Sequence, residues 1–342
     1  MFIGDHIKTP FADALEHGGD LTVARQMFPS APEPFIDLST GINPFSYPIP
    51  ALSDDVFVRL PDRAAVRRLA ATAAQWYGAP SADCVVSAPG TQILLPMVAA
   101  LVPPGSAAVL GPTYSEHMRA SALAGHDATE VSNIDQFKNA DLAVVVNPNN
   151  PDGRIASRAV LLDIAADLRQ RRGILVVDEA FMDVAQPGTS LAGDTHHDGI
   201  VVLRSFGKFF GLAGLRLGFA LTSPTLAARL NTLLGPWAIS GPAIAIAESA
   251  LTDEIWRDRT LQSLEQAAER LDRMLIGAGL EILGGTSLYR LTRSSGANHL
   301  FEQLGHAGIL VRRFDEHPTW LRWGIPHNSD AWQRLETVLS KS

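Results

Sequence analysis

The chain has 342 residues, of which 46% are hydrophobic and 19% charged, and its formal net charge is −8. This length suits one large domain with a smaller one, and the negative charge argues against non-specific nucleic-acid binding. The single cysteine, Cys84, excludes an intramolecular disulfide and a cysteine-based zinc cluster, and we expect no metal site. The N-terminus lacks the apolar core of a signal peptide, and the longest apolar run, residues 93–102, is too short to cross a bilayer. We therefore expect a soluble cytoplasmic enzyme without a membrane partner.

The middle of the chain alternates short apolar runs with helical patterns, which is typical of a mostly parallel α/β sheet. In chain order, we expect strands at residues 85–86, 107–110, 142–146, 174–177, 200–203 and 217–221. A helix should follow the first strand and reach Leu101, and another should cover residues 115–124. Ser157 is a suitable cap for a third helix, which Gly173 would stop.

After Pro236 and Trp237 the pattern changes to that of a smaller α+β domain. We expect a long helical region at about residues 243–276, strands at 287–291, 309–312 and 320–323, a helix at 298–306, and a last helix from about Asn328. The sequence therefore predicts a large α/β domain at 45–235 and a small α+β domain formed from 1–44 and 236–342.

Four chemically distinctive segments lie at or just beyond the ends of predicted strands. They are residues 90–92, residues 149–150, Asp178 and residues 205–208. Ligands of open α/β sheets bind at the carboxyl edge of the strands, so this convergence predicts an active site there.

Lys208 is one of only four lysines, and it lies between an apolar run ending at Leu203 and a glycine-punctuated segment ending with Arg216 and Gly218. This setting favours an amine that acts as a nucleophile beside an anion site, and a solvated surface lysine is the alternative.

A covalently held pyridoxal phosphate needs such a lysine, a partner for its pyridine nitrogen and an anion-binding loop. Asp178 follows an apolar run, so its partly buried carboxylate needs a cationic partner such as a pyridinium; a helix cap or a salt bridge is the alternative. Arg216 can bind phosphate bidentately, and Ser205 adds a hydroxyl donor. Residues 90–92 open a predicted helix, whose free amides also suit a phosphate.

Several motifs resemble those of the fold-type-I pyridoxal-phosphate enzymes, in the histidinol-phosphate aminotransferase branch of the class I/II aminotransferases. These motifs lie at residues 149–153, 178–181, 205–208 and 214–218. Within this branch, residues 17–20, 37–44, 203–210 and 236–237 are most similar to the L-threonine-O-3-phosphate decarboxylases of cobalamin biosynthesis. The resemblance covers nearly the whole chain. It implies an aspartate aminotransferase-like fold, pyridoxal 5'-phosphate as cofactor, and a homodimer.

The resemblance also implies roles at matching positions. Lys208 would bind the cofactor covalently and later move protons, Asp178 would pair with the pyridinium, and Asn150 would bond the phenolic oxygen. Tyr114 would stack on the ring, unless it is an ordinary core aromatic. The residues that match the family's phosphate site are Gly90, Thr91, Gln92, Ser205 and Arg216.

By the same resemblance, Arg322 would bind the substrate carboxylate and Arg312 the substrate phosphate. A surface salt bridge is the alternative for each arginine. His17 and Asn43 are further substrate contacts by the same resemblance. The expected reaction is decarboxylation of L-threonine O-3-phosphate to (R)-1-amino-2-propanol O-2-phosphate. Transamination of a phosphorylated amino compound such as histidinol phosphate is the alternative, and a non-catalytic scaffold is a third possibility.

Two positions depart from the family pattern. Phe181 stands where these aminotransferases usually have a tyrosine that bonds the phenolic oxygen, which favours a reaction other than ordinary transamination. Leu60 stands where the family often has a tyrosine that reaches the partner subunit's cofactor phosphate.

Overall fold

A computed structural model of the chain describes residues 17–341, and these residues form two compact units. One unit contains residues 45–261, and the other combines the segment ending at Pro44 with the segment beginning at Gln262. This division falls inside a helix, whereas the sequence pattern places the boundary at 235–236; the assignment of 45–235 as a domain stays a prediction. Among residues 17–341, no helix combines the length and the apolar composition that crossing a membrane requires.

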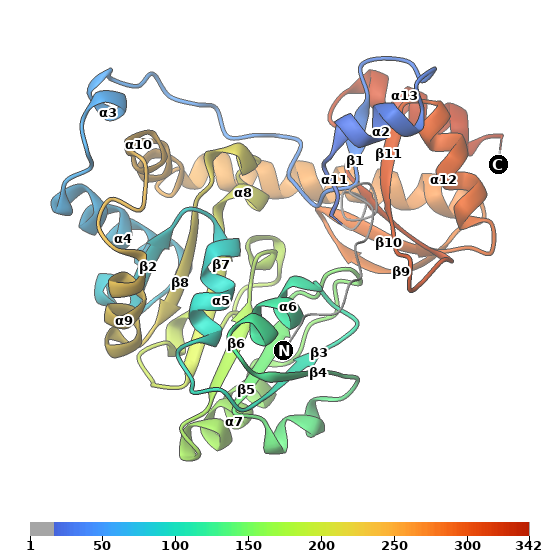
Figure 1. Ribbon diagram of the computed structural model, residues 1–342. Coiled ribbons are helices and arrows are strands. Elements are labelled where there is room, and N and C mark those ends of the chain that lie inside the picture. Colours follow the sequence, from blue (N-terminus) through green and yellow to red (C-terminus); the bar gives the residue numbers. More distant parts are fainter. Residues whose placement is uncertain (1–16, 342) are drawn as a thin grey trace. The chain divides into compact units, whose positions relative to one another are not determined.

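Within the described residues, the unit of residues 45–261 is built on a seven-stranded sheet in the order β2-β8-β7-β6-β5-β3-β4 (Figure 1). Its strands are β2 (Val85–Ala88), β3 (Ser106–Leu110), β4 (Asp127–Val131), β5 (Leu142–Val146), β6 (Ile174–Asp178), β7 (Ile200–Ser205) and β8 (Gly218–Thr222). β8 is antiparallel to both of its neighbours, and the other pairs are parallel. β5 and β6 are buried at every position, as expected for apolar runs in a sheet covered on both faces.

The helices of this unit pack around that sheet. They are α3 (Asp55–Val58), α4 (Arg63–Tyr77), α5 (Leu94–Ala99), α6 (Glu116–Leu123), α7 (Arg158–Gln170), α8 (Phe206–Phe209), α9 (Pro224–Leu234), α10 (Gly241–Ala250) and the first part of α11 (Glu254–Gly277). Leu95, Ala120 and Leu230, from α5, α6 and α9, share one buried cluster with Val176 and Leu203 of the sheet. The predicted cap is present, because the Ser157 hydroxyl accepts the Val160 N–H at 3.3 Å.

The helical region predicted at about residues 243–276 consists of two helices. The chain forms α10 and α11, separated by a turn at residues 251–253. The Asp253 carboxylate accepts the Trp256 N–H at 2.9 Å and so caps the second helix.

In the other unit, the described residues form a five-stranded sheet in the order β1-β11-β12-β10-β9. Its elements are α2 (Leu21–Met27), β1 (Ile36–Leu38), β9 (Glu281–Thr286), β10 (Tyr289–Arg293), α12 (Ala297–His306), β11 (Ile309–Arg313), β12 (Trp320–Gly324) and α13 (Ser329–Leu339). β1 is parallel to β11, with Ile36 opposite Ile309, so the N-terminal segment completes a sheet formed by the C-terminal one. The other pairs are antiparallel.

Three of the described strands have no counterpart in the sequence prediction. β1 has only three residues, which is too short to show an alternating pattern. β4 is an edge strand that carries Asp127 and Glu130, so it does not form an apolar run. β9 contains Gly284 and Gly285, and glycine lowers the strand propensity of that segment.

Candidate active site

The four predicted segments lie at one edge of the seven-stranded sheet. Because β8 is antiparallel, its first residue, Gly218, lies at the edge where β2 and β7 end, and it pairs with Ala88 and Ser205. Asp178, the last residue of β6, pairs with the last residue of β5, Val146. One edge of the seven-stranded sheet therefore carries the loop after β2, the turn after β5, Asp178 and the segment of Lys208.

Gly90 and Arg216 lie against each other at this edge. Gly90 has a φ of 83°, and a Cβ atom added there would lie 2.7 Å from Arg216 Nη2. A Cβ atom at Gly218 would lie 2.7 Å from the backbone nitrogen of Thr91. The two glycines thus leave room for a guanidinium and a backbone amide, and the structure brings together the residues predicted to bind a phosphate.

The side-chain amide of Gln92 is hydrogen-bonded to two other side chains of the protein. Its Oε1 accepts the Tyr114 hydroxyl at 3.1 Å, and its Nε2 donates to Glu116 Oε2 at 2.6 Å. Both ends of the amide take part in these contacts, so the backbone N–H of Gln92 is better suited than its side chain to bind an anion. The same contacts hold the hydroxyl end of Tyr114.

The Asp178 carboxylate is 6% exposed and is held from two sides. Its Oδ2 lies 2.8 Å from His117 Nε2, and its Oδ1 accepts the Ala180 N–H at 3.0 Å. His117 lies three residues after Tyr114, and the two rings meet edge to face with centroids 6.0 Å apart. His117 is not among the residues predicted from the sequence, although a histidine three residues beyond the predicted stacking aromatic would lie on the same side of a helix.

Lys208 is half-buried on α8, which directly follows β7. Its Nζ lies 5.6 Å from the centre of the Phe181 ring, which is 4% exposed. Asn150 lies in a turn held by Asn149, whose Oδ1 accepts the Thr113 hydroxyl at 2.7 Å and whose Nδ2 donates to Asp152 at 2.8 Å. The bond between Asn150 and Pro151 is cis.

In the other unit, Arg322 and Arg312 are paired across β12 and β11. Arg322 is 4% exposed, and its Nη2 donates to the Ser39 carbonyl at 2.6 Å. Burial, and next the charge of Arg312, lower the pKa of Arg322 to about 9. Arg322 is buried and Arg312 is half-buried. Two such cations side by side create a positive potential that favours the binding of an anion.

The two other predicted substrate contacts belong to the same unit. Asn43 is 1% exposed, and His17 is exposed. His17 lines a small cavity together with Ser39 and Arg312. The structure thus brings His17 and Arg312 to one cavity, and Arg312 beside Arg322.

The sequence from residue 34 to residue 335 matches the family model "Aminotransferase class I and II". The chain belongs to this family. A threonine-phosphate decarboxylase from a Sinorhizobium species is 41% identical over 328 residues, which cover 95% of this chain and 97% of that protein. A threonine-phosphate decarboxylase from Pseudomonas aeruginosa is 39% identical, with the same two shares covered. The structure of histidinol-phosphate aminotransferase from Sinorhizobium meliloti in complex with pyridoxal 5'-phosphate aligns with a TM-score of 0.80 and 18% identity, covering 99% of each chain.

Membership of the class I and II aminotransferases confirms the predicted family, fold class and cofactor, pyridoxal 5'-phosphate. The residues of this chain fit that cofactor. An amine, a buried carboxylate and a guanidinium beside a glycine loop are the groups that its aldehyde, ring nitrogen and phosphate require. The space beside Arg216 is specific to glycine, because any side chain at Gly90 would fill it.

Proposed function

We propose that this protein is a pyridoxal-phosphate-dependent decarboxylase. It converts L-threonine O-3-phosphate to CO2 and (R)-1-amino-2-propanol O-2-phosphate, in cobalamin biosynthesis. The observation that carries the proposal is the 39–41% identity, over nearly the whole chain, to two threonine-phosphate decarboxylases. Phe181 supports it, because it has no hydroxyl where the related aminotransferases usually have one.

Residues of the unit 45–261 hold the cofactor. Lys208 is its covalent attachment point, and Asp178 keeps its ring nitrogen protonated. His117 and the Ala180 N–H orient the Asp178 carboxylate for that contact. Asn150 binds the phenolic oxygen, and Tyr114 covers one face of the ring. The cofactor phosphate is bound by Gly90, Thr91, Gln92, Ser205 and Arg216.

Residues of the other unit select the substrate. Arg322 binds the carboxylate and Arg312 the phosphate, while His17 and Asn43 make further contacts. When bound, the cofactor supplies a conjugated ring that accepts the electron pair of the bond broken at the substrate Cα. Arg322 and Arg312 determine which Cα bond breaks, because they fix the rotation of the substrate about Cα. The Lys208 amine, released from the cofactor when the substrate amine takes its place, would then deliver a proton to Cα.

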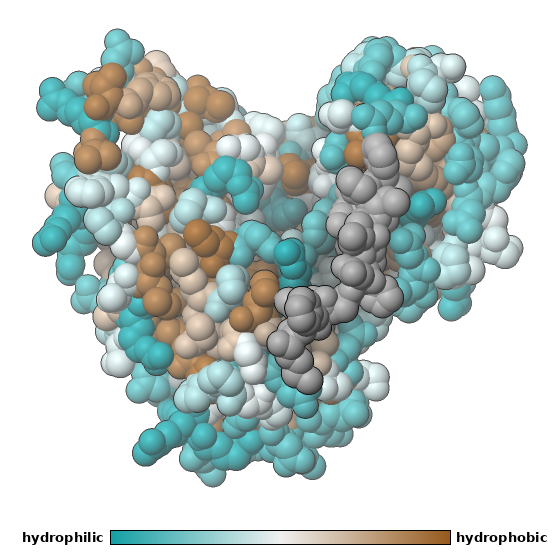
Figure 2. Space-filling view, viewed as in Figure 1, coloured by the Kyte–Doolittle hydropathy of each residue, from teal (hydrophilic) through white to brown (hydrophobic). Residues whose placement is uncertain are grey.

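We also propose that the protein is a homodimer. The unit 45–261 exposes apolar side chains on and beside α3, with Phe57 64%, Val58 77% and Leu60 68% exposed. Brown surface gathers over α3 at the upper left of Figure 2. A groove of about 1010 Å³, lined by residues of α4 and α9 and by Trp237, lies in the same unit. Exposed apolar surface of this kind marks a protein interface. Light scattering should give twice the chain mass, and Leu60→Asp should shift it towards the monomer.

A product assay tests the proposed reaction. Cofactor-loaded protein is incubated with L-threonine O-3-phosphate and a keto acid, and CO2, the phosphorylated amine and the aminated keto acid are measured. Equal amounts of CO2 and amine, with no amino transfer, support decarboxylation. Amino transfer without CO2 would overturn it and would favour a phosphorylated-amine aminotransferase, the alternative that the fold allows.

A further inference from the structure

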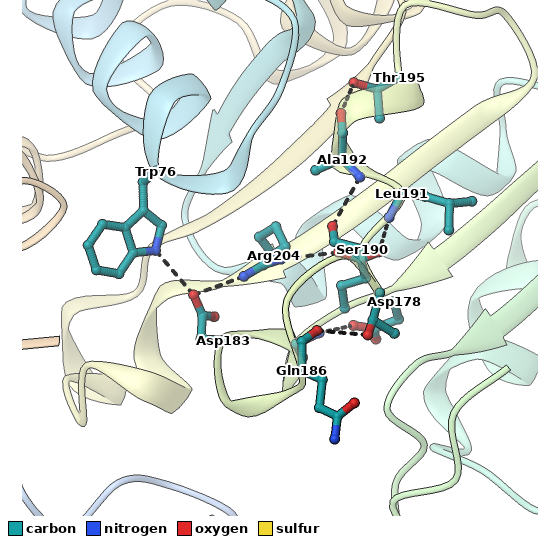
Figure 3. A network of polar contacts seen from close by, with 12 residues as sticks. Trp76, Asp178, Asp183, Gln186, Ser190, Leu191, Ala192, Thr195 and Arg204 are labelled. Atoms are coloured by element: carbon teal, nitrogen blue, oxygen red, sulfur yellow. Dashed lines mark hydrogen bonds and ion pairs between the residues drawn. The ribbon is translucent and has the colours of Figure 1, made fainter. Parts of the chain in front are cut away.

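Arg204, the penultimate residue of β7, forms a buried network with Glu179 and Asp183. Figure 3 shows Arg204 beside Asp183. Its Nη1 donates to Glu179 Oε2 at 3.1 Å, and its Nη2 lies 2.8 Å from Asp183 Oδ1. The three side chains are 5% exposed or less. Burial disfavours the charged guanidinium, but Asp183 and Glu179 outweigh it and raise the pKa of Arg204. One cation therefore joins two carboxylates in the interior.

The two carboxylates lie on either side of Phe181 in the chain, each two residues away. One guanidinium thus holds both ends of the turn at residues 179–183. The same turn carries two groups of the candidate site. The Ala180 N–H donates to Asp178 Oδ1 at 3.0 Å, and the Phe181 ring lies 5.6 Å from Lys208 Nζ.

Further hydrogen bonds hold the two carboxylates of the Arg204 network. Glu179 accepts the Ser190 hydroxyl at 2.5 Å and the Leu191 N–H at 2.8 Å, and Asp183 accepts the Trp76 indole N–H at 3.1 Å. Because side chains alternate along a strand, Arg204 points to the sheet face opposite that of Leu203. Arg204 therefore influences the candidate site through the turn, not by direct contact.

We propose that Arg204 is a positioning residue of the active site. By holding Glu179 and Asp183, it fixes the Phe181 ring against the Lys208 amine and the Ala180 N–H against Asp178. The proposal rests on the proposed function, since it takes Lys208 and Asp178 as the cofactor's partners. Removing one partner of a buried ion network is itself destabilising, so a stability measurement alone would not separate this role from a purely structural one.

The test compares Arg204→Lys with Arg158→Met. Arg204→Lys keeps the charge but loses the two-armed guanidinium that reaches both carboxylates. Arg158→Met is the matched control, because it breaks an arginine–carboxylate pair with Asp194, at 2.6 and 2.8 Å, in the same unit. Three readouts are taken: hydrogen exchange of residues 178–183 without cofactor, the pH dependence of the bound cofactor's absorbance, and kcat with KM.

For Arg204→Lys we expect faster exchange at residues 178–183 and a shifted absorbance pH profile. We also expect kcat to fall about 10- to 100-fold, as for a misplacement of reacting groups by about 1 Å, with a much smaller change in KM. Arg158→Met should match the wild type in all three readouts. A folded Arg204→Lys with wild-type exchange and pH profile, or equal effects of both variants, would overturn the proposal.

If Arg204→Lys does not fold, Glu179→Gln takes its place with the same expectations. It keeps an oxygen for the Leu191 N–H but turns an amide towards Arg204. The two proposals fail in different ways. A wild-type protein that binds the cofactor but releases no CO2 from L-threonine O-3-phosphate refutes the decarboxylase, whereas the exchange and absorbance results still decide the role of Arg204.

Discussion

The His117 imidazole lies 2.8 Å from the Asp178 carboxylate, and both side chains are buried. Asp178 also accepts the Ala180 N–H, so the carboxylate has a fixed orientation before any cofactor binds. Its place at the end of β6 is set by the sheet, and the direction of its oxygens is set by His117.

Removing the imidazole should therefore weaken the cofactor site. We expect His117→Phe to raise the Kd for pyridoxal 5'-phosphate by about tenfold or more, since a hydrogen bond to a charged group contributes about 1.5–3 kcal/mol. Titration of the cofactor-free protein by absorbance measures this Kd. His126→Gln is the control, because His126 is also buried and bonds only the Ala99 and Gly105 backbone. The interpretation fails if the two variants bind the cofactor equally well.

A pair of glycine variants tests the phosphate loop. Gly90 and Gly78 have φ values of 83° and 78°, so alanine at either position should cost about 1 kcal/mol of stability. Only at Gly90 would the new Cβ meet Arg216, whereas at Gly78 no described residue other than its chain neighbours lies within 4 Å of the Cβ position. We expect both variants to lower the Tm, and Gly90→Ala alone to weaken cofactor binding. Equal cofactor affinity in the two variants would show that the loop of Gly90 does not bind the cofactor phosphate.

The paired arginines predict a dependence on pH. Burial and the charge of Arg312 lower the pKa of Arg322 to about 9, so the neutral form of Arg322 grows as pH rises through that value. The neutral form cannot pair with a carboxylate, so binding favours the protonated form, and affinity is kept below pH 9 and lost above it. We expect KM to rise with pH above about 9, towards about tenfold per pH unit.

Two variants separate the causes of this pH dependence. Arg322→Met should have a high KM that no longer changes near pH 9. Arg312→Met removes one cause of the lowered pKa of Arg322, so its KM should begin to rise only at a higher pH. A wild-type KM that stays constant from pH 8 to pH 10.5 would contradict the lowered pKa of Arg322, and an Arg322→Met KM equal to that of the wild type would show that Arg322 does not bind the anion.

The parts of the site that the sequence predicted depend on short-range patterns. Asp178 ends β6 and Lys208 lies shortly after β7. Both strands begin with a buried apolar run, and parallel strands bring their carboxyl ends to one edge. Gly90 was assigned to the phosphate loop because glycine follows a strand and precedes a helix, and its positive φ agrees with that choice. Local sequence was enough for these residues because the sheet itself brings them together.

The parts that sequence reasoning missed depend on contacts between elements. His117 reaches Asp178 only because α6 packs on the sheet face that Asp178 shares, and the Arg204 network joins a strand to a turn that follows another strand. The break after α10 depends on Asp253, whose capping bond competes with continuation of an apolar helical pattern. No periodicity in one segment encodes such pairings, since each needs the packing of two elements.

The covalent attachment of the cofactor is the claim on which the proposed roles depend, and peptide mapping after borohydride reduction tests it most directly. We expect the reduced cofactor on the peptide that contains Lys208, and no label on that peptide in Lys208→Ala. Label on Lys138 or Lys341, or no label in cofactor-loaded wild-type protein, would contradict it.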